Sequence, residues 1–299
     1  MKRLLEKGVS PREIAAFLSA ERKGEDFEVH SLASLQDAKP HTLVFSKNTL
    51  RTEEFTGLKK VCFLVSVFPD SFGDNAFILT ANPRLAYAKV ASRFFMQKKA
   101  PSIGADCLID SSARIAATAV IGRGCVIGAN VRIGEDTELR HHVVIADNVK
   151  VGKGCLIKSH AVIGEEGFGF DFEDDGTPVR VPHIGGVVIQ DYVEIGALTS
   201  IARGTLRDTI IGSHVKIDDH VFIAHNCVIG EKSVVIAKSE VSGSVEVGPR
   251  CWLAPGCTIK NKLRIGARAM VGMGAVVLQD VPAGAVVVGN PARILRMRE

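Results

Sequence analysis

Residues 211–241 read IGSHVK IDDHVF IAHNCV IGEKSV VIAKSE V when written in blocks of six, with an aliphatic residue opening every block. Neither the 3.6-residue period of an α-helix nor the alternation of an ordinary strand produces this spacing. A six-residue period fits a short strand followed by a turn, and three such units close one triangular coil. The stretch therefore predicts a repeat fold in which the aliphatic side chains stack inside the coils.

The same frame covers most of the chain. An aliphatic residue recurs every six positions from Ile103 to Ile163, again from Ile189 to Ile201, and, after a slip of two positions, from Ile211 to Val277. Gly often follows the aliphatic residue and relieves the tight corners. The prediction is a mainly β protein built as a parallel β-helix.

The first hundred residues lack the six-residue frame. Ser10-Pro11-Arg12-Glu13 has the pattern of a capping box at a helix start, and Asn82-Pro83 opens a second helix with an expected apolar stripe of Leu85, Val90 and Phe94. Apolar runs at Leu43–Phe45 and Val61–Val67 predict strands. We expect a small α/β domain at 1–100, the β-helix at 101–281 with a loop insertion at 164–187, and a C-terminal cap at 282–299.

Composition excludes several classes of protein. Lys and Arg exceed Asp and Glu by only 37 − 33 = 4, which is no nucleic-acid-binding footprint. No apolar stretch approaches the roughly 20 residues of a transmembrane helix, and the N-terminus has no signal-peptide pattern, so we expect a cytoplasmic protein. Seven cysteines without a CxxC pair predict neither a disulfide framework nor a metal site.

A loop and a histidine suggest where chemistry takes place. The stretch Gly164–Phe170 leaves the repeat frame, and a loop leaving a rigid scaffold is where a site is expected. Among nine histidines, His225 lies two residues after the inward-facing Ile223, near a corner that can reach a cleft between subunits. A histidine titrates near neutrality and suits a general base, although a corner histidine can also be an ordinary turn residue.

The six-residue spacing resembles that of the hexapeptide family of left-handed parallel β-helices, and further motifs narrow the resemblance. The segments Ala33–Ala38, Leu43–Phe45 with Asn48, Asn82–Ala88, Gly167–Phe170 and Ile217–Asn226 resemble, in that order, the UDP-3-O-acylglucosamine N-acyltransferases of lipid A synthesis. The resemblance implies a left-handed helix, a homotrimer with sites between subunits, and an N-terminal domain that holds a nucleotide.

Roles for individual residues follow from the resemblance. His225 matches the general base and Asp218 an acid that orients it. Arg51 stands where the family usually has Tyr, and Arg can also stack on a base. The predicted acceptor-binding residues are Phe45, Asn48, Arg51, Phe168, Gly169, Phe170 and Asn226.

The C-terminal part departs from this family. The resemblance implies that Lys262 stands in place of the family's second functional His, and its ammonium can stabilise an oxyanion. The segments Gly272–Val277 and Val288–Arg293 resemble the CoA-dependent hexapeptide acetyltransferases instead. The predicted donor-binding residues are Lys262, Gly274, Asn290, Pro291 and Arg293.

The sequence therefore predicts an N-acyltransferase that moves an acyl group from a thioester of acyl carrier protein or CoA to a nucleotide-linked amino sugar, in lipid A or surface-polysaccharide synthesis, with no bound cofactor or metal. An acetyl-CoA-dependent sugar acetyltransferase and a non-catalytic scaffold are the alternatives. Acyl length, sugar identity and transfer to N or O stay open. Apolar side chains on the outer walls predict a trimer: Val126, Val144, Val162, Val188, Phe222, Val228 and Trp252.

Overall fold

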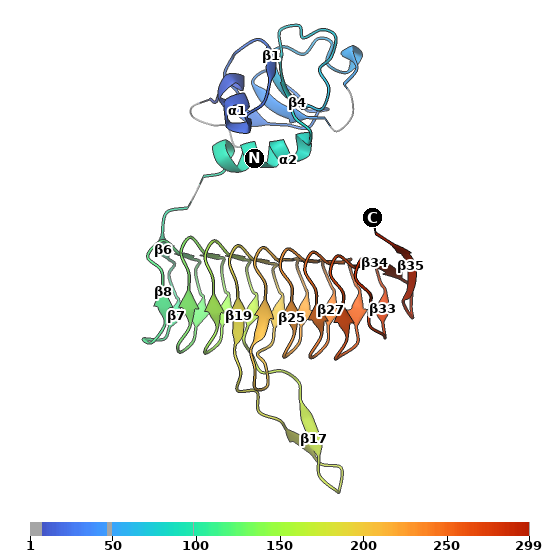
Figure 1. Ribbon diagram of the computed structural model, residues 1–299. Coiled ribbons are helices and arrows are strands. Elements are labelled where there is room, and N and C mark those ends of the chain that lie inside the picture. Colours follow the sequence, from blue (N-terminus) through green and yellow to red (C-terminus); the bar gives the residue numbers. More distant parts are fainter. Residues whose placement is uncertain (1–7, 47–49, 98, 299) are drawn as a thin grey trace. The chain divides into compact units, whose positions relative to one another are not determined.

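The computed structural model describes residues 8–46, 50–97 and 99–298. The chain divides into two compact units, Met1–Lys98 and Lys99–Glu299 (Figure 1). Within the described residues, no helix is both long enough and apolar enough to cross a membrane.

The first unit is a five-stranded sheet with helices. The strand order is β1-β5-β4-β3-β2, and all neighbours are parallel except β1 and β5. Alternate residues of β4 enter two different apolar clusters, one shared with both helices. The elements are α1 (Pro11–Leu18), β1 (Arg22–Gly24), β2 (Ser31–Leu32), β3 (Thr42–Phe45), η1 (Thr52–Glu54), β4 (Val61–Val65), β5 (Ala76–Leu79), α2 (Pro83–Val90) and the π-helical turn η2 (Ala91–Phe95).

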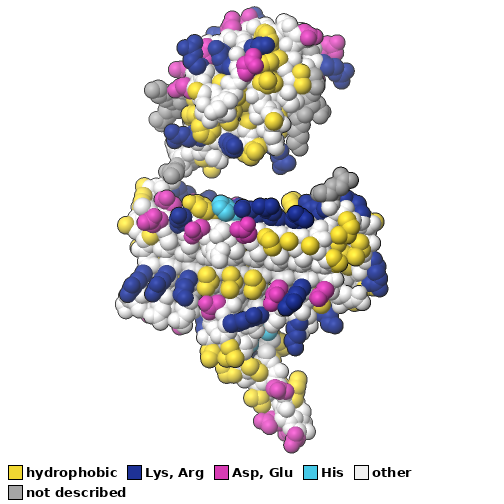
Figure 2. All heavy atoms as spheres, in the orientation of Figure 1, with side chains coloured by type: hydrophobic (Ala, Val, Ile, Leu, Met, Phe, Trp, Pro, Cys, Tyr) yellow, Lys and Arg dark blue, Asp and Glu magenta, His cyan; other side chains and the backbone are white. Residues whose placement is uncertain are grey.

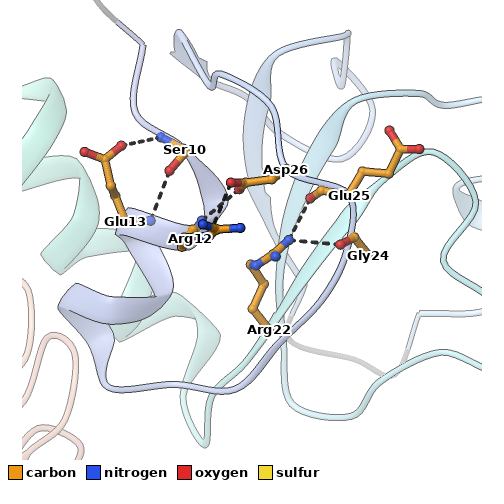
Figure 3. A network of polar contacts seen from close by, with 7 residues as sticks. All are labelled: Ser10, Arg12, Glu13, Arg22, Gly24, Glu25 and Asp26. Atoms are coloured by element: carbon orange, nitrogen blue, oxygen red, sulfur yellow. Dashed lines mark hydrogen bonds and ion pairs between the residues drawn. The ribbon is translucent and has the colours of Figure 1, made fainter.

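Both predicted helix starts are confirmed. The Ser10 hydroxyl accepts a hydrogen bond from the Glu13 N–H at 3.2 Å, and the Glu13 carboxylate accepts one from the Ser10 N–H at 2.9 Å (Figure 3). Asn82 caps α2 in the same way. The predicted stripe on α2 was wrong at Leu85, which is exposed, because Ala86 and Val90 supply the buried face.

The second unit is a triangular coil of three parallel sheets, which confirms the predicted left-handed parallel β-helix, as the first unit confirms the small α/β domain. We call the sheets A, B and C. Sheet A contains β7 (Leu108–Ile109), β10 (Val126–Ile127), β13 (Val144–Ile145), β16 (Val162–Ile163), β21 (Ser200–Ile201), β24 (Phe222–Ile223), β27 (Glu240–Val241), β30 (Thr258–Ile259) and β33 (Val276–Val277).

The other two faces are built alike. Sheet B contains β8 (Arg114–Ile115), β11 (Arg132–Ile133), β14 (Lys150–Val151), β19 (Val187–Ile189), β22 (Thr209–Ile211), β25 (Val228–Ile229), β28 (Glu246–Val247) and β31 (Arg264–Ile265). Sheet C contains β6 (Ser102–Ile103), β9 (Val120–Ile121), β12 (Glu138–Leu139), β15 (Leu156–Ile157), β20 (Glu194–Ile195), β23 (Lys216–Ile217), β26 (Val234–Val235), β29 (Trp252–Leu253), β32 (Met270–Val271), β34 (Ala285–Val288) and β35 (Arg293–Met297).

Stacking between coils holds this unit together. Ile223 pairs with Val241 and Phe222 with Glu240, so residues 18 apart lie one above the other. Ile103 of the first coil is exposed, whereas from β9 to β33 the aliphatic residue of each coil strand is buried inside the coil, where it contributes roughly 1.5–3 kcal/mol. Its predecessor points outward, as strand alternation requires.

Two insertions leave the coil at one corner. Sheet A continues into sheet B through residues 164–186 after β16, and through 202–208 after β21. The longer insertion carries an antiparallel hairpin, β17 (Phe170–Phe172) and β18 (Pro178–Arg180), which extends away from the coil in Figure 1. Backbone bonds from Arg203 to Glu165 and from Ile184 to Thr205 join the two insertions. The slip of two positions that the repeat frame makes between Ile201 and Ile211 is therefore caused by a second, shorter loop, residues 202–208, which lies next to the loop of residues 164–186.

The C-terminal end closes with β34 and β35. β34 pairs in parallel with β32, and β35 returns antiparallel along β34. All seven cysteines are free. Burial raises the pKa of the Cys227 thiol to about 11, as expected for a small core residue.

Candidate active site

His225 lies at the same corner as the two insertions, in the coil that follows them. It lies two residues after the end of β24, and it lines a pocket of about 440 Å³ built from the insertion and three successive coils. The lining residues are Phe168, Phe222, Ala224, His225, Glu240, Ser242, Gly243, Ser244, Lys260, Asn261 and Lys262.

Two glycines make room for the imidazole. A Cβ atom on Gly243 would lie 2.7 Å from Cε1 and 2.8 Å from Nε2 of His225. A Cβ atom on Gly167 would lie 3.0 Å from Cβ and 3.0 Å from Cδ2 of the same residue. Any larger residue at either position would displace the ring, so the glycines determine where His225 can lie.

Asn226 determines which nitrogen of His225 carries hydrogen. Its Oδ1 accepts a hydrogen bond from the Thr205 N–H at 2.8 Å, which turns Nδ2 toward His225 Nδ1 at 3.0 Å. An amide NH₂ group can only donate, so Nδ1 accepts. In this ring orientation the neutral imidazole therefore carries its hydrogen on Nε2.

A second histidine packs against the first. The rings of His183 and His225 have centroids 5.0 Å apart and are inclined at 70°. Partial burial lowers the pKa of His225 because it disfavours the imidazolium, and the neighbouring His183 lowers it further. His225 is therefore neutral at physiological pH, as a proton acceptor must be.

The three predicted residues of the loop differ in their positions. Phe168 lines the pocket although its side chain is 84% exposed. Phe170 lies outside the lining, edge-on to Phe168 and under the Arg180 guanidinium. A Cβ atom on Gly169 would lie 2.9 Å from Cε1 of His183, so this glycine leaves room for the second histidine.

Asp218 and His225 are not in contact among the described residues. The Asp218 carboxylate accepts a hydrogen bond from the Ala237 N–H at 3.3 Å, and Asp218 follows β23 on a different sheet. The predicted orienting role of Asp218 stays a prediction. Within one chain, it is Asn226 that contacts Nδ1 of His225. Lys262 does share the pocket with His225, together with Lys260.

The remaining predicted donor residues lie toward the C-terminal end. Gly274 is at a coil corner with φ +64°, and the Asn290–Pro291 bond is cis between β34 and β35. Arg293 begins β35 and lines a separate pocket of about 320 Å³. The structure thus groups Lys262 with the histidine but not these four.

In the first unit, the predicted nucleotide-binding residues are only partly described. Phe45 is half-buried and packs against Tyr87, with ring centroids 4.9 Å apart. The backbone N–H of the exposed Arg51 donates to the Glu54 carboxylate. Asn48 lies outside the described residues.

Gly243 and His183 were missed by sequence reasoning. Gly243 could have been found, because it lies 18 residues after His225 and one coil takes 18 residues. His183 lies within an insertion that has no repeat, so no spacing places it. Among the described residues, no group of three or more His, Cys, Asp and Glu side chains could hold a metal ion.

Comparison with known proteins agrees with this architecture. Residues 100–135 and 130–165 match the model of the bacterial transferase hexapeptide family (six repeats). UDP-3-O-acylglucosamine N-acyltransferases from Pseudomonas syringae and Pseudomonas aeruginosa are 38% and 40% identical to the chain, each over 69% of it. The chain spans 64% of the length of both relatives, which is less than two thirds.

Solved structures point to the same group of enzymes. The UDP-N-acetylglucosamine O-acyltransferase from Moraxella catarrhalis superimposes with a TM-score of 0.60 at 31% identity, covering 65% of this chain and 74% of that one. The UDP-N-acetylglucosamine acyltransferase from Francisella novicida gives a TM-score of 0.59 at 30% identity, covering 64% and 69%. The chain therefore carries the repeat of the bacterial transferase hexapeptide family, and it is similar to the UDP-3-O-acylglucosamine N-acyltransferases and to the UDP-N-acetylglucosamine acyltransferases.

Proposed function

We propose that the protein is an N-acyltransferase of lipid A synthesis that moves an acyl group from a thioester to the amino group of a UDP-linked amino sugar. The observation that carries this proposal is the pocket that brings His225 together with Lys260 and Lys262, where partial burial lowers the pKa of His225. Relatives with this printed activity support it, as does the corner position of the histidine.

The chemistry requires a base and an oxyanion site. The sugar nitrogen attacks the thioester carbonyl, a C–N bond forms, and one N–H proton must leave. His225 takes that proton and later delivers it to the departing thiolate. The Gly243 N–H has no hydrogen-bond partner among the described residues, and with the Lys262 ammonium it would stabilise the oxyanion.

The donor is a thioester of acyl carrier protein or CoA, and no bound cofactor takes part. CoA is favoured by one feature, the basic strand β35, on which Arg293 and Arg296 are exposed and suit the phosphates of CoA. That feature supports the acetyl-CoA-dependent sugar acetyltransferase as the second candidate.

A homotrimer is part of the proposal. The outward residues of sheet B run Arg114, Arg132, Lys150, Val188, Ile210 and Val228. Figure 2 shows this row of basic side chains continuing into a row of hydrophobic ones. Apolar side chains in a continuous row on a rigid wall favour burial against a second copy.

The test is a panel of donors and acceptors with the purified chain. Acetyl-CoA, longer acyl-CoA and acyl carrier protein thioesters are each combined with UDP-, dTDP- and GDP-linked amino sugars, and products are detected by mass. We expect transfer to a UDP-sugar amine from a long-chain donor. Transfer of acetyl groups alone would favour the second candidate, and no transfer from any donor would contradict both.

A further inference from the structure

His183 is a buried histidine whose second nitrogen has no hydrogen-bond partner within the part of the chain that the structure describes. It lies between β18 and β19, and its side chain is 3% exposed. Nδ1 lies 2.9 Å from the Val181 carbonyl oxygen, which can only accept, so Nδ1 carries the hydrogen. Nε2 therefore has a free lone pair, and among the described residues nothing donates to it. A buried acceptor without a donor is rare enough to require an explanation.

The lone pair of Nε2 borders the ring of His225. A Cβ atom on Gly167 would lie 2.9 Å from His183 Nε2 and 3.0 Å from His225 Cδ2. Both atoms therefore face the same small space, which stays open because residue 167 has no side chain. Of the His225 ring atoms, Cδ2 is the one on the Gly167 side in this ring orientation, and a carbon atom gives His183 no adequate donor.

A half-turn of the His225 ring about χ2 would supply the donor. The turn exchanges Nδ1 with Cδ2, and Nε2 with Cε1, without moving the ring plane. Nδ1–H would then lie beside His183 Nε2. Both Nε2 and Cε1 lie against Gly243, so Nε2 remains on the Gly243 side of the site after the turn.

We propose that His183 is a positioning residue that accepts the Nδ1 hydrogen of His225 in the turned ring, and so leaves His225 Nε2 free to take the proton of the attacking amine. The described orientation, held by Asn226, is then the resting state, in which Nε2 carries hydrogen and cannot act as a base. This inference rests on the proposed acyl transfer, because the turn has a purpose only if Nε2 must accept a proton.

The exchange of partners is nearly balanced. When the ring turns, Asn226 Nδ2 loses its bond to His225 but keeps the one to Thr205 Oγ1 at 3.1 Å, while His183 gains its missing donor. One hydrogen bond replaces another, so both orientations are accessible. During transfer the amine proton passes to Nε2 as the C–N bond forms, and it passes from Nε2 to the thiolate as the C–S bond breaks.

The experiment compares His183→Phe with His183→Gln. Phe keeps a ring against His225 but has no acceptor, whereas Gln offers an amide oxygen. The matched control is His160→Phe, because the His160 ring also packs against a histidine ring, that of His142, with centroids 5.1 Å apart, but lies outside the pocket. Circular dichroism and thermal unfolding confirm that each variant folds.

Two readouts are needed. ¹⁵N-labelled histidine spectra of the full chain without substrate report the tautomer of His225, and steady-state kinetics report kcat and KM. We expect an Nδ1–H population of His225 in the wild type that is absent in His183→Phe and present in His183→Gln. We expect kcat to fall about 10- to 100-fold in His183→Phe with little change in KM, and to recover in His183→Gln.

The possible outcomes separate the two proposals. If His225 carries hydrogen only on Nε2 in the wild type, or if His183→Phe keeps its turnover, the positioning role is wrong whatever the reaction is. If the tautomers behave as expected but no donor and acceptor pair reacts, the hydrogen bond from His225 Nδ1 to His183 Nε2 stands and the proposed acyl transfer fails.

Discussion

Asn226 Nδ2 lies 3.0 Å from Nδ1 of His225, and the two residues are consecutive at one corner of the coil. Asn226 has φ +60°, a conformation that Asn tolerates better than most residues, and Thr205 holds its side chain from two directions. The amide is therefore a rigid donor that sets the resting tautomer of His225.

Asn226→Asp should change the protonation of His225. A carboxylate at this position keeps the bond from the Thr205 N–H but accepts from Nδ1 instead of donating to it, so it favours the imidazolium and raises the pKa of His225. In a plot of kcat against pH, the fall in activity on the acid side should therefore occur at higher pH than in the wild type. A fall at unchanged pH in Asn226→Asp would show that Asn226 does not face His225 in solution.

His225→Ala should lower turnover by about 10²–10⁴ and leave folding almost unchanged. The side chain lies in a pocket beside glycines and not inside the coil, so little packing is lost. Initial rates at saturating substrates and thermal unfolding check the two parts. Near-normal turnover would contradict the assignment of the base.

Gly243→Ala should also lower kcat, because the added Cβ would lie 2.7 Å from Cε1 of His225 and displace the ring. The double variant with His225→Ala provides the control. It should be no less active than His225→Ala alone, since both changes act on one ring. Multiplicative losses in the double variant would mean that the added Cβ disturbs more than the histidine ring.

The activity should depend on pH through His225. Burial and His183 lower its pKa below the ordinary 6.5, so activity should persist at pH 6.5 and fall only at lower pH. The same group contributes stability that is present above pH 6.5 and is lost as pH falls through the lowered pKa. The other charged groups lining the pocket are Glu240, Lys260 and Lys262. A half-maximal point above 6.5 would contradict the assignment.

Ile210→Glu should dissociate the trimer while the coil stays folded. Ile210 points outward between Val188 and Val228, so a carboxylate there would be buried in the interface we propose. Lys150→Glu is the control, because it changes an already charged position in the same row. Light scattering should show monomers only for Ile210→Glu. If the wild type is itself a monomer, the trimer is wrong.

The sequence by itself determined the β-helix, because its stabilising contacts are repeated. Each six-residue block places one aliphatic residue inside the coil, and no distant contact has to be known to predict this. The helix starts at Ser10 and Asn82 were predictable for the same reason, since capping is a contact between residues three apart. The corner position of His225 follows from its distance to Ile223.

The tertiary structure alone decided what surrounds His225. His183 is 42 positions earlier in a loop without periodicity, and only the folding of that loop onto the next coils brings the two rings together. The bonds of Asp218 to Ala237 and of Asn226 to His225 depend on side-chain orientations at the corners, which the repeat leaves free. A period specifies the inward positions because burial is the same in every coil, whereas each corner side chain meets different neighbours.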